Sequence, residues 1–147
     1  MIHDMQSGDP DTLDRFLAAQ DGVCDEALAE LRRGRKQSHW MWFIFPQLRG
    51  LGRSAMAHRY GIVDLDEARR YLGHPVLGPR LSACGRAMLD HRDESADTIL
   101  GPVDAAKLRS SATLFAAAGG DPRIFDDILA AFFGGRPCPL TLERLVR

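Results

Sequence analysis

The sequence has few of the features that mark secreted, membrane-spanning or metal-binding proteins. Only three of its 147 residues are cysteine, and Cys24, Cys84 and Cys138 lack the CxxC spacing of a zinc site or a thioredoxin-like motif. No apolar run approaches the ~20 residues that a membrane-spanning helix needs, and the polar, acidic N-terminus does not resemble a secretory signal. We therefore expect a cytoplasmic protein with reduced cysteines, no membrane contact, no metal site and no cofactor.

Acidic residues are missing from one long segment. Between Arg32 and Val63 the chain has seven Lys or Arg residues and no Asp or Glu. Because the net charge of the whole chain is −1, the residues outside this segment together carry a charge of −8. The near-zero total argues against long-range attraction to nucleic acid or to an anionic membrane. The segment predicts a basic face instead. Docking of this face (residues 32–63) onto an acidic partner, or self-association through the chain's own acidic surface, is one functional hypothesis.

Strand patterns are also scarce, because β-branched residues nowhere alternate with polar ones. Apolar residues recur at spacings of three and four, which is the period of a helix with one buried face. The length suits one domain with one core. We predict a single all-α domain over residues 1–147, a compact bundle of about six to eight short and medium helices, with residues 1–8 flexible.

Proline, glycine and acidic residues predict where these helices begin and end. A proline opens four periodic stretches, at Asp9–Pro10, His74–Pro75, Gly101–Pro102 and Asp121–Pro122. Asp64 and Glu67 have the spacing of a capping box. The predicted core stripes are Leu77, Leu81, Cys84 and Met88; Leu108, Ala112 and Phe115; and Phe125, Leu129 and Phe132. A turn at residues 135–139 precedes a short C-terminal helix.

The densest feature is the run RKQSHWMWFIFPQ, residues 35–47, which contains both tryptophans of the chain. An apolar stretch as dense as Trp40–Phe45 is expected to be mostly buried. We interpret it as a short helix with Ser38 as its cap and Pro46 near its end, although the same residues are also compatible with a buried strand. The polar residues around it are therefore more informative about function than the aromatic ones.

These flanking residues form the candidate site of the preferred hypothesis, which is binding of a small anionic or nucleotide-like ligand; docking through the basic face is the alternative. Arginine and lysine suit phosphate and carboxylate groups, and a tryptophan face stacks on a base. His39 is the candidate general acid or base, because its ordinary pKa lies near neutrality. The candidate residues are Arg35, Lys36, Ser38, His39, Trp40, Gln47, His58 and Arg109.

Each candidate also has a purely structural interpretation. Ser38 fits a helix cap, and a histidine beside an apolar face is more often hydrogen-bonded than catalytic. Arg109 lies about 100° around its helix from the core stripe, so it borders the core and suits either a ligand or an ion pair. The glycine-rich LRGLGRS lacks the strand and the spacing of a phosphate loop. A Cys24–His39 pair lacks a neighbour that would lower the thiol pKa.

Four motifs, RKQSHWMWFIFPQLRGLG, AHRYGI, KLRSSATLF and FFGGRPCPLTLERL, occur in this order and together span most of the chain. In this respect the sequence resembles the bacterial family known as domain of unknown function eighteen-ten, some members of which carry the label calpastatin. The resemblance implies a compact all-helical single domain. It brings no established activity, substrate or catalytic residue.

Overall fold

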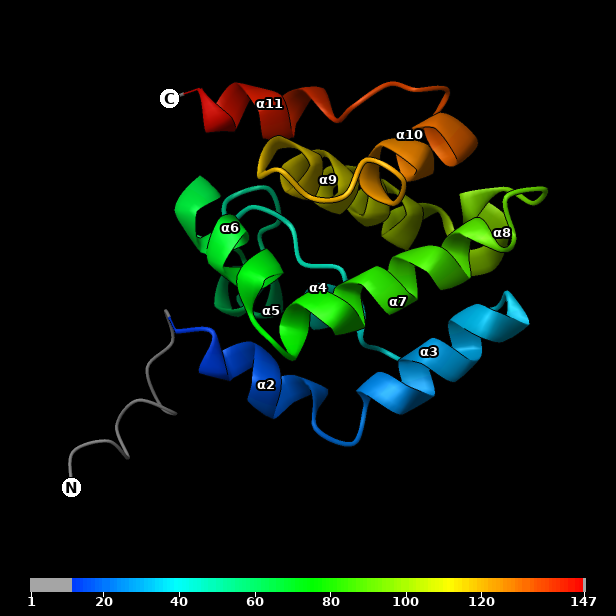
Figure 1. Cartoon of the computed structure of the whole chain (residues 1–147), viewed down its shortest axis with the longest axis horizontal. Coiled ribbons are helices and arrows are strands. Elements are labelled where there is room, and N and C mark those ends of the chain that lie inside the picture. Colours follow the sequence, from blue (N-terminus) through cyan, green and yellow to red (C-terminus); the bar gives the residue numbers. More distant parts are fainter. Residues whose placement is uncertain (1–11, 147) are drawn as a thin grey trace.

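A computed structural model describes residues 12–146 (Figure 1). The Asp9–Pro10 signal and the expected flexible residues 1–8 lie outside the described residues. Within residues 12–146 there are ten helices and no strand, as the all-α prediction requires. The helices are α2 (Asp14–Gln20), α3 (Cys24–Arg33), α4 (Met41–Ile44), α5 (Ala55–Arg59), α6 (Leu65–Gly73), α7 (Leu77–Leu89), α8 (Ala96–Leu100), α9 (Pro102–Ala117), α10 (Phe125–Phe133) and α11 (Pro139–Leu145).

The two longest helices, α7 and α9, lie in the middle of the molecule, and the other helices pack around them (Figure 1). Helix α3 packs on α7, α10 and α6 contact both long helices, and α8 and α11 pack on α9. Helix α2 contacts the short α4. No helix in the described part of the chain has the length and apolar character needed to cross a membrane.

The three predicted core stripes face the interior. The side chains of the α7 stripe and of the α9 stripe are all 1% exposed or less, whereas the α10 stripe is buried at Phe125 and Leu129 and half-buried at Phe132. Helix α9 begins at Pro102 after Gly101, as predicted. Periodicity therefore identified the core helices correctly. The expected proline at the first helical position is found in α9, whereas α7 begins at Leu77, after Pro75, and α10 begins at Phe125, after Pro122.

A continuous row of aromatic rings crosses this core. Phe16 of α2 meets Tyr71 of α6 edge-on with ring centroids 5.1 Å apart. Tyr71 in turn lies 5.4 Å from Phe115 of α9, which lies 5.7 Å from Phe125 of α10. Aromatic pairs at these separations contribute about 0.5–1.5 kcal/mol each beyond the area they bury. The row therefore joins four helices that are distant in sequence.

The dense apolar run folds as one helical turn, α4, and its side chains are buried except for a partly exposed Trp42. Interpreting this run as core is thereby confirmed. The predicted cap is wrong, because α4 follows Trp40 without any side-chain cap, and the Ser38 hydroxyl donates to carboxylates of α3 instead. A single bridge between Leu48 and Ile62 holds the loop that follows.

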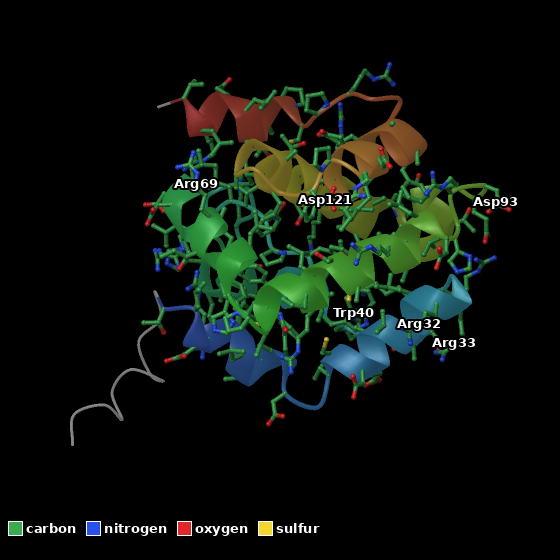
Figure 2. The ribbon with its side chains drawn as sticks, viewed as in Figure 1. Arg32, Arg33, Trp40, Arg69, Asp93 and Asp121 are labelled. Carbon is green, nitrogen blue, oxygen red and sulfur yellow. The ribbon has the colours of Figure 1, made fainter. Side chains whose placement is uncertain are left out.

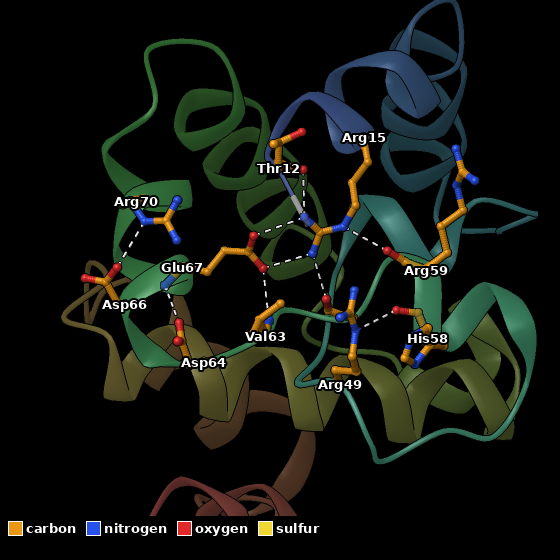
Figure 3. A network of polar contacts seen from close by, with 11 residues as sticks. Thr12, Arg15, Arg49, His58, Arg59, Val63, Asp64, Asp66, Glu67 and Arg70 are labelled. Carbon is orange, nitrogen blue, oxygen red and sulfur yellow. Dashed lines mark hydrogen bonds and ion pairs between the residues drawn. The ribbon is translucent and has the colours of Figure 1, made fainter. Parts of the chain in front are cut away.

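The predicted capping box at the start of α6 is half correct. Asp64 accepts a hydrogen bond from the backbone N–H of Glu67, as a cap should. The carboxylate of Glu67 does not return to Asp64 but accepts two hydrogen bonds from the guanidinium of Arg15, at 2.9 and 3.0 Å, and one from the N–H of Val63 (Figure 3). This ion pair is buried, with 1% of each side chain exposed.

Candidate functional site

Three segments that are distant in sequence line a cleft of about 260 Å³, which we call the α9 cleft. They are the loop between α4 and α5, one face of α9, and the beginning of α11. The lining residues are Gln47, Leu51, Gly52, Ala106, Lys107, Ser110, Cys138 and Leu140. Three of the four motifs singled out in the sequence therefore contribute side chains to the same cleft.

Helix α9 places a cation and a hydroxyl on the cleft wall. Residues three apart share one face of a helix, so Lys107 and Ser110 both reach the cleft. The Ser110 hydroxyl is buried and lies 2.9 Å from Oγ1 of Thr141, which ties α11 to α9. The side chain of Lys107 keeps 22% of its area exposed. Lys107 is therefore the accessible charged group of the cleft.

Two lysines of this region each lie over a tryptophan ring, and they share one carboxylate. The ammonium of Lys107 is 4.9 Å from the ring centre of Trp42, and that of Lys36 is 5.0 Å from the ring centre of Trp40. Oδ2 of Asp104 lies 3.0 Å from Nζ of Lys36, and Oδ1 of Asp104 lies 3.4 Å from Nζ of Lys107. Because two cations meet one carboxylate, the group keeps an excess positive charge, and Lys107 is the less tightly held of the two.

Arg109 holds the turn that leads to Cys138, one of the residues that line the cleft. Its guanidinium donates from Nε to the carbonyl of Arg136 at 2.9 Å and from Nη2 to the carbonyl of Pro137 at 3.0 Å. The next N–H, that of Cys138, donates to Oγ1 of Thr113 at 2.9 Å. The turn before α11 is thus fixed to α9 by side chains. Arg109 borders the core as predicted, with its planar donor group engaged by the backbone.

The opposite wall carries an amide group. Gln47 is half-buried, and its side-chain carboxamide makes no hydrogen bond within residues 12–146. Gly52 lies beside it, and a Cβ at position 52 would lie 2.7 Å from Cβ of Ala57 and 3.6 Å from Nε2 of Gln47. Glycine at position 52 therefore avoids a clash with Ala57. The carboxamide of Gln47 can both donate and accept a hydrogen bond in the cleft.

A buried carboxylate positions the segment that carries the tryptophans. Glu30 of α3 accepts hydrogen bonds from the N–H groups of Gln37 and Ser38, from the Ser38 hydroxyl and from the indole of Trp40. Burial raises the pKa of Glu30, but these hydrogen bonds more than offset it and lower the pKa to about 2. Ser38 and Trp40 are thus partners of Glu30, and Trp40 is fully buried.

The remaining predicted site residues do not converge on the cleft. Arg35 forms an exposed ion pair with Glu94 at 3.0 Å, and its Nη1 also donates to the carbonyl of Gly34. His39 and His58 are exposed, and neither lines the α9 cleft. Of the eight candidates, Gln47 lies in the cleft, whereas Lys36 is connected to it through Asp104. An acid–base role for His39 stays a prediction.

The basic segment 32–63 does not form one continuous face. Arg32 and Arg33 lie at the C-terminal end of α3 (Figure 2), whereas α5 lies on the other side of the molecule (Figure 1). Arg35 and Lys36 are neutralised by acidic residues from other parts of the chain. The segment's charge is therefore divided between separate regions and partly cancelled, which weakens the docking hypothesis.

Four residues of this region lie outside the eight candidates: Trp42, Asp104, Lys107 and Cys138. Lys107 was visible as a basic residue among hydroxyls in AAKLRSS, but its position over Trp42, 65 residues earlier, depends on how α9 packs against the α4 turn. The partly polar surroundings of Cys138 likewise arise only when α11 folds back on α9. No group of three or more His, Cys, Asp or Glu side chains in the described part of the chain is arranged to hold a metal ion.

The fold and the cleft define a small all-helical protein in which a central helix carries a cleft with apolar walls and a few polar groups. The chain belongs to the family described as Protein of unknown function (DUF1810), whose model matches residues 10–145. It is similar to the conserved hypothetical protein Rv1873 from Mycobacterium tuberculosis, with 47% sequence identity over 95% of this chain and 99% of that chain, and a TM-score of 0.91. No curated protein matches the chain.

Proposed function

We propose that the protein binds a small anionic ligand in the α9 cleft, with the ammonium of Lys107 as the main anchor. The observation that carries this proposal is the Lys107–Trp42 contact. In this contact the ammonium of Lys107, which lines the cleft, lies 4.9 Å from the ring centre of the partly exposed Trp42. A cation that remains 22% exposed keeps part of its hydration and pairs readily with an incoming carboxylate or phosphate.

The other lining groups support a ligand that is anionic at one end and apolar at the other. Gln47 offers a donor and an acceptor with no partner in the described part of the chain. Leu51, Ala106 and Leu140 supply apolar walls, and Leu140 is 61% exposed. Clefts that combine apolar walls with a few placed polar groups are the usual form of small-molecule sites.

The volume of the cleft limits the size of the ligand. At about 260 Å³ it lies below the range of roughly 300–1,000 Å³ that is common for drug-sized ligands. A whole nucleotide would extend beyond the cleft. Of the two tryptophans considered for stacking on a base, Trp40 is buried and Trp42 is partly exposed. The proposal therefore favours small carboxylates and phosphate esters over nucleotides.

A thermal-shift screen of small carboxylates, phosphate esters and inorganic phosphate tests the proposal. We expect at least one compound to raise the Tm, and Lys107→Gln to weaken its binding roughly 10- to 100-fold, because a hydrogen bond to a charged group contributes about 1.5–3 kcal/mol. Arg33→Gln on α3 is the matched control, since it removes an exposed charge outside the cleft. Equal shifts in both variants, or no shift with any compound, would contradict the proposal.

A further inference from the structure

The charge of the α9 cleft comes from a single side chain. Of the described residues that line the cleft, Lys107 alone is charged, and Asp104 partly neutralises it at 3.4 Å. Arg109, two positions further along α9, does not line the cleft, and its guanidinium is engaged by two backbone carbonyls. The cleft therefore balances one negative charge. A phosphate ester, which carries about −1.5 to −2 at pH 7, would lack a second cation.

The two walls of the cleft carry one hydrogen-bond donor group each. The ammonium of Lys107 belongs to α9, and the carboxamide of Gln47 belongs to the loop that follows α4. Within residues 12–146 the carboxamide has no hydrogen-bond partner. A carboxylate between the walls can accept from both groups, one with each oxygen. These donors and the single charge favour a carboxylate as the head group of the ligand.

An apolar wall continues from the cleft along α9. Val103, Ala106 and Lys107 are spaced three and four residues apart, so their side chains share one face of the helix. Val103 is 70% exposed and Ala106 is also exposed. Leu140, which lines the cleft from α11, is 61% exposed. An alkyl chain that extends from Lys107 over these side chains removes apolar surface of both partners from water, which is favourable.

We propose that the anion bound in the α9 cleft is a short-chain aliphatic monocarboxylate, a proposal that rests on the function proposed above and narrows its ligand class. The carboxylate pairs with Lys107 and accepts a hydrogen bond from Gln47. The alkyl chain lies along Val103, Ala106 and Leu140. A dicarboxylate of the same length fits less well, because its second charge would lie on the apolar wall without a partner.

The experiment measures the Kd of acetate, butyrate, hexanoate, adipate and inorganic phosphate for the full-length protein by NMR titration. Each methylene group that the wall buries should tighten binding about two- to four-fold, and the upper figure applies to full burial. Hexanoate should therefore bind at least roughly 10-fold more tightly than acetate. Adipate has as many carbons as hexanoate but a carboxylate at each end, so it should lose this gain.

Substitutions in the apolar wall separate the binding of the tail from that of the head group. Val103→Ser and Leu140→Ser should each weaken the binding of hexanoate at least about two-fold and leave the Kd of acetate unchanged. Val146→Ser is the matched control, because Val146 is 84% exposed and does not line the cleft. All three side chains are exposed, so the variants should fold like the wild type.

Equal affinities for acetate and hexanoate, or for adipate and hexanoate, would overturn the monocarboxylate proposal but leave an anion site in the α9 cleft. Binding of phosphate without binding of any carboxylate would have the same meaning. If none of these anions binds, or if Lys107→Gln binds them as tightly as the wild type, the function proposed above fails together with the monocarboxylate proposal.

Discussion

The guanidinium of Arg15 and the carboxylate of Glu67 form a buried bidentate ion pair between residues that are 52 positions apart in sequence (Figure 3). The remaining donors of Arg15 bind the carbonyls of Thr12, Arg59 and Gly61. All five N–H groups of the arginine are thus in use. Helix α2, the α5–α6 connection and α6 meet at this one side chain, so it fixes the part of the fold that precedes the core helices.

Breaking this pair should strongly destabilise the protein. We expect Glu67→Gln to reduce the free energy of unfolding by about 3–5 kcal/mol, because it leaves a buried guanidinium without its counter-charge. Arg70→Ala, which removes an exposed ion pair with Asp66 on the same helix, should cost less than about 1 kcal/mol. Urea unfolding of both variants measures the difference, and equal losses would show that the buried pair has no special role.

The carboxylate of Glu30 should make stability depend on pH in the acid range. Its pKa in the folded protein is about 2 against an ordinary value of 4.5, so the folded state holds this proton less tightly than the unfolded state. The resulting stabilisation is present above about pH 4.5 and is lost as the pH falls towards 2. A shift of this size corresponds to about 3 kcal/mol.

Glu30→Gln tests this assignment, because it removes the titrating group and keeps its shape. The variant should be less stable than the wild type at pH 7, and the gap should close between about pH 4.5 and pH 2. Urea unfolding at a series of pH values gives the curve for each protein. Parallel curves over this range would mean that Glu30 does not cause the acid sensitivity.

Substitution of each of the two lysines that share Asp104 should show which of them stabilises the fold and which is available to bind a ligand. The side chain of Lys36 is 9% exposed and also donates a hydrogen bond to the carbonyl of Ser38. Lys36→Met should therefore lower the free energy of unfolding by about 1.5–3 kcal/mol. Lys107→Met, at the cleft, should cost about 1 kcal/mol or less. Thermal unfolding of the two variants checks the order. A larger loss for Lys107→Met would make that lysine a structural residue.

A pair of glycine substitutions tests the packing of α7. A Cβ at Gly85 would lie 2.6 Å from Cγ2 of Ile124, so Gly85→Ala should push α7 away from the start of α10 at a cost of about 1–3 kcal/mol. At Gly73, the last residue of α6, a Cβ would meet nothing within 4 Å, so Gly73→Ala should be neutral or slightly stabilising. Chemical unfolding measures both changes. An unaffected Gly85→Ala would show that this interface adapts easily.

Local patterns were sufficient to predict the helices and much of the core. The stripe through Leu81 and Cys84 and the helix start at Pro102 depend only on residues near one another in sequence. Ser38 was misassigned because its real partner, Glu30, belongs to another helix, and no spacing rule links them. A local sequence pattern predicts only contacts between residues that lie within a few helical turns of one another.

The candidate site was harder to predict for the same reason. Gln47 was identified because it ends an unusual motif, and it does line the cleft. Lys107 gains its position over Trp42 only when α9 packs against the α4 turn. The net charge of the basic segment was also misleading, since Lys36 is paired with Asp104, which lies 68 residues later in the chain. Contacts between distant segments decide which charges remain accessible.

The most direct test of ligand binding in the α9 cleft uses the two tryptophans as probes. Inorganic phosphate, acetate and small dicarboxylates are titrated into ¹⁵N-labelled protein, and the two indole N–H signals are followed by NMR. We predict a saturable shift of the Trp42 signal, little change for Trp40, whose N–H is bonded to Glu30, and no shift of Trp42 in Lys107→Gln. A Trp42 signal that stays in place with every anion, or that moves equally in Lys107→Gln, would contradict the account.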